Sequence, residues 1–136
     1  MILSVHHVGC LVANIDDAIA DYNILHPGGK VSEVFDIIDQ RVKVCFFSIG
    51  IMCIEFVAPY GEESSLSKML KKTPGFYHIG VYTDNISAEI ERLENEGYRK
   101  VSQFKSSAFG NRFCAFLLNN EHHLIELIEA EDKIVM

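Results

Sequence analysis

The spacing of apolar and polar residues changes along the chain, and the first half shows five segments in order. Residues 2–12 are apolar and β-branched, which predicts a strand. Asn14 is a candidate helix N-cap. A helix to about residue 24 follows, because apolar residues recur there at helical spacing: Ile15, Ala18, Ile19 and Tyr22. Three strands are expected next, at about 31–38, 41–49 and 51–58.

The second half repeats this order. We predict a strand at 76–83, a helix at 86–97 and strands near 99–104, 112–118 and 122–129, with the last hairpin turn at 119–121. Between the halves, residues 60–75 form a linker with a short helix at 65–72, which Pro74 and Gly75 close. Only the last few residues have the character of a tail.

A shift of 71 positions superposes the two halves without a gap. Residues 6–19 then align with 77–90 at five identical positions, and Ile54-Glu55 aligns with Ile125-Glu126. The distance from His to Glu is 48 positions in both halves, from His7 to Glu55 (55 − 7) and from His78 to Glu126 (126 − 78). These coincidences indicate a tandem duplication of one supersecondary unit.

The predicted fold class is therefore α+β, with two tandem βαβββ units at about 1–59 and 76–130 that form a curved mixed sheet around a metal cavity. Each unit is too small to bury its own apolar face, so we expect residues 1–136 to make one domain. A pseudo-twofold relation between the units would bring equivalent positions to one sheet surface.

Composition and charge restrict the classes of function. The formal net charge is −7 and Lys and Arg are scattered, which argues against binding nucleic acid or an anionic membrane surface through charge. No segment has the pattern of a targeting signal, and no apolar stretch approaches the roughly 20 residues that span a bilayer. The four cysteines lie in apolar runs without a CxxC pair, which favours buried free thiols and a cytoplasmic location over a disulfide framework.

The candidate metal ligands are His7, Glu55, His78 and Glu126. A carboxylate is seldom buried in an apolar strand without a partner, because desolvating its charge is costly, and here two such Glu recur at one distance from two His. Two imidazole nitrogens and two carboxylate oxygens suit one divalent ion, Co²⁺, Ni²⁺, Zn²⁺, Mn²⁺ or Fe²⁺. Glu126 and Glu55 are also the candidate catalytic bases, since a carboxylate beside a polarised carbonyl can take a proton from the adjacent carbon.

Other polar residues are weaker candidates. A single His in an apolar strand is more often structural than ligating, and strand alternation turns His6 and His123 away from the predicted site. His122 lies four positions before Glu126 and would share its face, which makes it a candidate pocket residue. Gln40 and Asn111 are related by the repeat and stand at strand starts, where either one contacts a substrate or both cap turns.

The duplicated unit with its His, Glu, His, Glu order resembles the vicinal-oxygen-chelate superfamily of glyoxalases, epimerases, extradiol dioxygenases and bleomycin-resistance proteins. Three stretches resemble its methylmalonyl-CoA epimerase branch: IEFVAPYGEESSLSKML (54–70), FYHIGVYTDNI (76–86) and FGNRFCAFLL with HLIELIE (109–129). The resemblance implies the same four metal ligands, pocket positions for Gln40 and Arg112, and a homodimer. The chain departs from the branch at Ser65, where a linker Pro is usual, and on the third strand, where Lys43 and Val44 are the candidate positions for a further acidic residue that one subgroup carries.

These observations lead to three hypotheses of function. The first is a metal-dependent isomerase that moves a proton next to a carbonyl, epimerase-like on an acyl-CoA thioester such as methylmalonyl-CoA. The alternative is a lyase of the glyoxalase I (lactoylglutathione lyase) type, which would use the same metal and carboxylates. A further alternative is a metal-free protein that binds a small molecule, although four intact ligand types argue against it. Neither nucleic acid nor a membrane is an expected partner.

Overall fold

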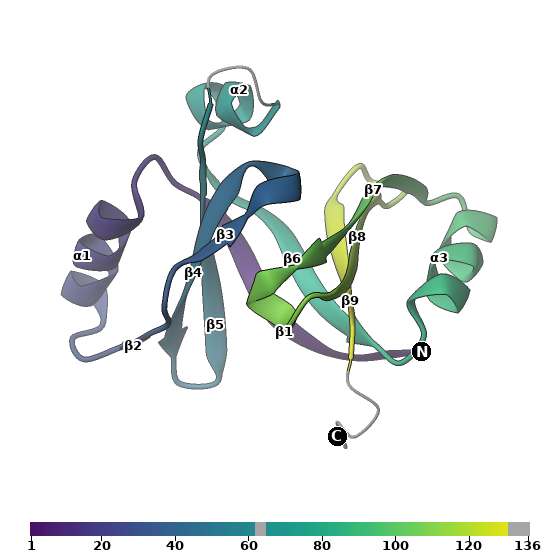
Figure 1. The fold of residues 1–136 in the computed structure, drawn as a ribbon, viewed down its shortest axis with the longest axis horizontal. Helices are drawn as coiled ribbons and strands as arrows, with labels where there is room; N and C mark the ends of the chain where they lie inside the picture. The colour runs from purple at the N-terminus through teal and green to yellow at the C-terminus, as the bar shows by residue number, and fades with distance from the viewer. Residues whose placement is uncertain (62–64, 131–136) are drawn as a thin grey trace. The chain divides into compact units, whose positions relative to one another are not determined.

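The structure is a computed structural model that describes residues 1–61 and 65–130 (Figure 1). Within these residues it contains three α-helices and a mixed sheet of nine strands, which confirms the predicted α+β class. The chain divides into two compact units: a first unit of His7–Tyr77, and a second unit of Met1–His6 with the chain from His78 onward. None of the described helices is long and apolar enough to cross a membrane.

The first unit contains most of the elements predicted for the first half of the chain. β1 (Ile2–Leu11), whose last five residues belong to this unit, pairs in parallel with β5 (Met52–Pro59), and β5 forms an antiparallel hairpin with β4 (Val42–Ile49). The helix α1 (Ile15–Leu25) lies where the sequence predicts it. The linker helix α2 (Ser65–Lys72) also has the predicted bounds, whereas linker residues 62–64 and the expected tail at 131–136 lie outside the described residues.

The prediction of one continuous strand at 31–38 is wrong. The segment is divided into β2 (Lys30–Val31) and β3 (Phe35–Ile37), each antiparallel to β4, and a short 3₁₀ helix, η1 (Ile38–Gln40), follows. The break has a local cause at Ser32. Its hydroxyl oxygen accepts a hydrogen bond from the backbone N–H of Phe46 at 2.8 Å, so a side chain takes the place of a strand carbonyl.

The second unit repeats the first. β6 (Gly75–Thr83) pairs in parallel with β9 (Leu124–Glu129). β8 (Arg112–Leu118) is antiparallel both to β9 and to β7 (Arg99–Ser106). The 3₁₀ helix η2 (Ser107–Phe109) follows β7 in the chain. The helix α3 (Ile86–Asn95) follows β6. The last strand begins two residues later than predicted, because the side-chain oxygen of Asn119 accepts hydrogen bonds from the N–H groups of Glu121 and His123 and holds a turn there.

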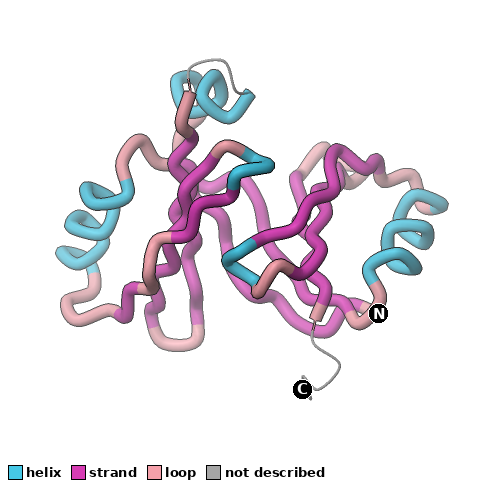
Figure 2. The backbone as a smooth tube through the Cα atoms, viewed as in Figure 1, coloured by secondary structure: helices cyan, strands magenta, loops and turns pink. Residues whose placement is uncertain are grey.

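Each unit places one helix against its own strands (Figure 2). Asn14 and Asn85 cap α1 and α3 in the same way, each side chain accepting a backbone N–H three residues later at 3.0 Å. Below α1 the core is built from buried side chains that include Cys10, Cys45, Phe47, Ile54 and Phe56. The core between α3 and its strands includes Val81, Ile90, Leu93, Leu117 and Leu127. The helix-covered faces are therefore occupied mainly by apolar packing.

Candidate metal centre

The first unit brings His7 and Glu55 together. Glu55 on β5 stands directly opposite Gly9 on β1 in the parallel register. His7 precedes Gly9 by two positions and so shares its face. Because Gly9 has no side chain, the carboxylate can lean toward the imidazole, and His7 Nε2 lies 3.5 Å from Glu55 Oε1. Both side chains are buried, at 1% and 5% exposure.

The second unit builds the same pair from different strands. Glu126 on β9 stands opposite Gly80 on β6, and His78 precedes that glycine by two positions. His78 Nε2 lies 3.5 Å from Glu126 Oε1, and the two residues are 5% and 4% exposed. The register, the glycine and the separation all match the first pair. The 71-residue shift found in the sequence is therefore a repeat of local geometry as well as of residue type.

The donor set fits a divalent cation. Among the described residues, each unit contributes one buried imidazole and one buried carboxylate that could ligate a metal ion: His7 and Glu55 in the first, His78 and Glu126 in the second. Two imidazole nitrogens with two carboxylate oxygens are the mixed donors that first-row divalent metals accept. Two buried carboxylates need positive charge or hydrogen bonds to offset their lost hydration. A bound cation supplies the positive charge directly.

Two phenylalanines beside the pairs were missed in the sequence. Phe46 on β4 stands opposite Glu55, and Phe116 on β8 stands opposite Glu126. The Phe46 ring lies 5.8 Å from the His7 ring, and the Phe116 ring lies 5.2 Å from the His78 ring. The ungapped shift conceals their equivalence, because Phe46 precedes its Glu by nine positions and Phe116 precedes its Glu by ten. A search that allowed one extra residue in the second hairpin would have aligned them.

The expected pocket residues lie at the ends of strands. Gln40 is half-buried in η1, and Asn111 is exposed at a positive φ of 61° just before β8. Arg112 donates from Nε to the Phe109 carbonyl at 2.7 Å and from Nη1 to the Glu129 carbonyl at 3.2 Å, so it braces the ends of two segments. His122 is exposed at a φ of 64° in the turn before β9. Because it lies outside the strand, the alternation of strand faces does not place it on the face of Glu126. Contact of these residues with a substrate stays a prediction.

Lys43 and Val44 on β4 are the two candidate positions for a further acidic residue, and only Val44 shares the face of Glu55. Val44 stands opposite Val57, two residues after Glu55, and is buried. Lys43 stands opposite Ala58 and faces the α1 side. Neither position brings a carboxylate to the face of the His7–Glu55 pair.

The cysteines and the remaining strand histidine have structural surroundings. None of the four cysteines forms a disulfide. Cys10, Cys45 and Cys114 are buried, as predicted, whereas Cys53 is only half-buried. Burial raises the pKa of the Cys10 and Cys45 thiols. His6 packs edge-on against the rings of Tyr82 and Phe109 at 5.2 and 5.0 Å. None of these contacts requires a role in metal binding.

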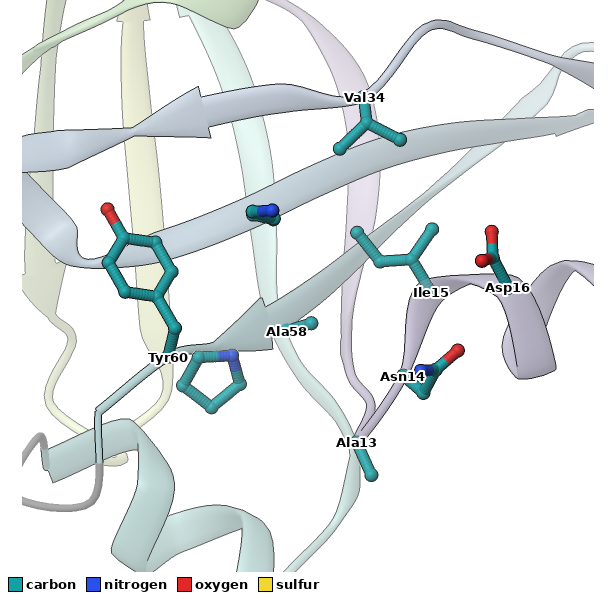
Figure 3. A pocket seen from close by; sticks show the side chains of 9 residues that line it. Ala13, Asn14, Ile15, Asp16, Val34, Ala58 and Tyr60 are labelled. Carbon is teal, nitrogen blue, oxygen red and sulfur yellow. The ribbon is translucent and has the colours of Figure 1, made fainter.

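A cavity of about 370 Å³ opens beside the start of α1 in the first unit (Figure 3). Its lining includes Lys43 and Ala58, which belong to the face opposite that of Glu55. Val34 and Tyr60 at its rim are 51% and 37% exposed. The cavity is therefore separate from the His7–Glu55 pair.

The chain is similar in sequence to known proteins. Residues 6–116 match the sequence model of the Glyoxalase/Bleomycin resistance protein/Dioxygenase superfamily. Human mitochondrial methylmalonyl-CoA epimerase is 33% identical over 101 residues, covering 72% of this chain and 56% of the human protein. An ethylmalonyl-CoA/methylmalonyl-CoA epimerase of Cereibacter sphaeroides is 34% identical over 102 residues, covering 73% of this chain and 75% of that protein.

Similarity to solved structures extends over nearly the whole chain. The structure of methylmalonyl-CoA epimerase from Mycobacterium tuberculosis superposes with a TM-score of 0.83 at 27% identity, covering 97% of this chain and 91% of that one. The chain spans little more than half the length of the human and mouse relatives it matches, 56% and 55%.

Proposed function

Because this chain belongs to the glyoxalase/bleomycin resistance protein/dioxygenase superfamily, we propose that it is a divalent-metal epimerase. Its reaction would move a proton on the carbon next to the carbonyl of an acyl-CoA thioester such as methylmalonyl-CoA. The observation that carries the proposal is the duplicated His–Glu pair, buried and separated by 3.5 Å in each unit. The names of the relatives support this substrate class over other chemistries of the superfamily.

His7, Glu55, His78 and Glu126 would hold the ion, whether cobalt, nickel, zinc, manganese or iron. When bound, the cation supplies a Lewis acid that draws electron density from the thioester carbonyl. These residues would supply four donors, and an ion that takes six ligands would still have room for substrate oxygens.

Glu126 is the proposed base. Its carboxylate would take the proton from the reacting carbon, and a proton from solvent would return on the opposite face. Glu55 is the second carboxylate of the proposed site, and the resemblance places either Gln or Glu at its position. We therefore assign proton transfer chiefly to Glu126 and ligation chiefly to Glu55.

The proposal is tested by metal analysis and a substrate comparison on one preparation. Protein soaked in Co²⁺, Ni²⁺ or Zn²⁺ and then desalted should retain one ion per chain and should epimerise methylmalonyl-CoA. Chelation should abolish turnover, and returning the metal should restore it. A protein that leaves methylmalonyl-CoA unchanged but converts the methylglyoxal–glutathione adduct would be a glyoxalase I-type lyase instead. Absence of retained metal would favour the metal-free binding protein.

We further propose a cytoplasmic homodimer. The family resemblance supports the dimer, and four cysteines that form no disulfide suit a reducing compartment. Sedimentation equilibrium at micromolar concentration should give twice the chain mass of 15.3 kDa. A mass near that of one chain contradicts the dimer.

A further inference from the structure

A pair of phenylalanine rings backs the histidine in each unit. In the first unit the His7 ring meets Phe46, and Phe46 lies 6.2 Å from Phe35 on β3. In the second unit the His78 ring meets Phe116, and Phe116 stacks on Phe104 of β7 at 5.5 Å and 27°. The same order of imidazole, first ring and second ring therefore occurs twice, although the ungapped repeat does not align these residues.

The strand register explains why the first ring is placed to act on the ligands. Each Glu has a cross-strand neighbour on both sides: Gly9 and Phe46 for Glu55, and Gly80 and Phe116 for Glu126. The glycine leaves room on the side of the histidine, and the phenylalanine fills the other side. The carboxylate is thus confined to the side on which the imidazole lies.

An aromatic neighbour limits how the imidazole can turn. A His side chain rotates about two bonds, and only some orientations aim Nε2 at its Glu. The Phe116 ring meets the His78 ring nearly at a right angle, 85°, which is a favoured edge-to-face contact, whereas Phe46 meets His7 at 58° and at a longer distance. The contact in the second unit is the tighter of the two, and Phe104 supports it from behind.

We propose that Phe116, and more weakly Phe46, are positioning residues that hold the two histidines in the orientation that binds metal. The metal-binding part of this inference rests on the proposed function. The orienting part concerns the metal-free protein and can be tested by itself. Pre-oriented ligands bind more tightly because less motion is lost when the ion arrives.

The variants are Phe116→Leu and Phe46→Leu, which keep an apolar side chain and remove the ring. Phe116→Tyr restores the ring. The matched controls are Phe113→Leu, on the opposite face of β8, and Phe47→Leu, in the core below α1 on the opposite face of β4. Two quantities are measured for each: the Co²⁺ dissociation constant by titration, and the His ring signals of the metal-free protein in ¹H–¹⁵N spectra.

We expect Phe116→Leu to raise the Co²⁺ dissociation constant by roughly tenfold, the lower end of effects from residues that support metal ligands. Phe46→Leu should raise it less, and Phe116→Tyr should stay near wild type. The His78 ring signals should broaden in Phe116→Leu and not in Phe113→Leu, because an imidazole without the Phe116 ring exchanges between orientations. Phe47→Leu should lower thermal stability without weakening metal binding.

Two failures are distinguishable. A wild-type protein that binds no Co²⁺ overturns the proposed metal site. His78 ring signals that stay as sharp in Phe116→Leu as in wild type overturn the positioning role, even if their chemical shifts change, because removing the Phe116 ring alters the local ring current. An equal loss of Co²⁺ affinity in Phe113→Leu also overturns it.

Discussion

The two units hold the same His–Glu pair in different surroundings. The separation is 3.5 Å in both, with a glycine and a phenylalanine flanking each Glu. Away from the pair the units differ. The cross-strand pair beside the 3₁₀ helix is Ile37 with Val42 in the first unit and Ser106 with Arg112 in the second. Ala18 is buried on α1, whereas the equivalent position on α3 carries the buried carboxylate Glu89.

This difference identifies which features the pair depends on. The residues that are the same in both units are the cross-strand neighbours of the two Glu. The residues that differ lie at the strand ends or on the helices. The pair geometry is therefore set by a few cross-strand neighbours, and the rest of each unit can change without disturbing it. The following experiments ask whether the two matching pairs also act alike, and what the differences around them contribute.

The largest expected effect separates the two carboxylates. Glu126→Gln keeps an oxygen donor and removes the basic carboxylate, so turnover should fall by roughly 10²-fold or more while metal is retained. Glu55→Gln should be milder. Epimerisation rates and wash-in of solvent deuterium at the reacting carbon measure both. Near-full turnover of metal-loaded Glu126→Gln would remove Glu126 as the base.

The two histidines should act alike. His7→Ala and His78→Ala each remove one nitrogen donor, so each should weaken metal affinity by roughly 10-fold to 100-fold or more. Calorimetric titration with Co²⁺ or Zn²⁺ measures this, with His6→Ala and His123→Ala as controls that should stay near wild type. If only one of the two ligand variants lost affinity, the pairs would not share a single ion.

The helix side should show a difference in stability. Burial raises the pKa of the Glu89 carboxyl, but hydrogen bonds from Arg92 and the Met1 amine outweigh burial, so its pKa lies below the usual value. A lowered folded-state pKa stabilises the fold above the unfolded-state pKa, and this contribution disappears as the pH falls through the folded-state pKa. Glu89→Gln should therefore cost about 1–2 kcal/mol at neutral pH.

Urea unfolding at several pH values measures this effect. The difference between Glu89→Gln and wild type should shrink as the pH falls below about 4. Glu91→Gln, at an exposed carboxylate on the same helix, is the matched control and should stay within about 0.5 kcal/mol. A pH-independent loss in Glu89→Gln would assign the effect to packing.

The smallest effects are expected at the repeat-related strand starts. Gln40→Ala and Asn111→Ala test whether either residue contacts the substrate. Because Gln40 is half-buried and Asn111 is exposed, only Gln40→Ala should raise KM, by a few-fold. Equal KM values in both variants and wild type would leave the two residues as turn formers.

The sequence predicted the fold and the two buried His–Glu pairs for a physical reason. A buried Glu between apolar neighbours is expensive, so its recurrence at a fixed distance from His carries information that packing alone would not produce. The split of the strand at 31–38 was not predictable, because it depends on one hydroxyl of Ser32 replacing a carbonyl across the sheet. Phe46 and Phe116 were missed because phenylalanines in apolar strands are common and the ungapped shift does not align these two, although both stand opposite a Glu in the sheet.

The division of β1 between the units has a consequence for how the chain folds. The first unit is continuous from His7 to Tyr77, whereas the second joins Met1–His6 to the chain after His78. Completing the second unit therefore closes a loop of 71 residues (77 − 7 + 1). Closing such a loop costs about 4 kcal/mol of chain entropy if the loop is disordered, and less if the loop has already folded. During synthesis from the N-terminus, the first unit is complete before β9 exists. We therefore expect the faster folding route to be the one in which the first unit folds first and brings the two segments of the second unit together.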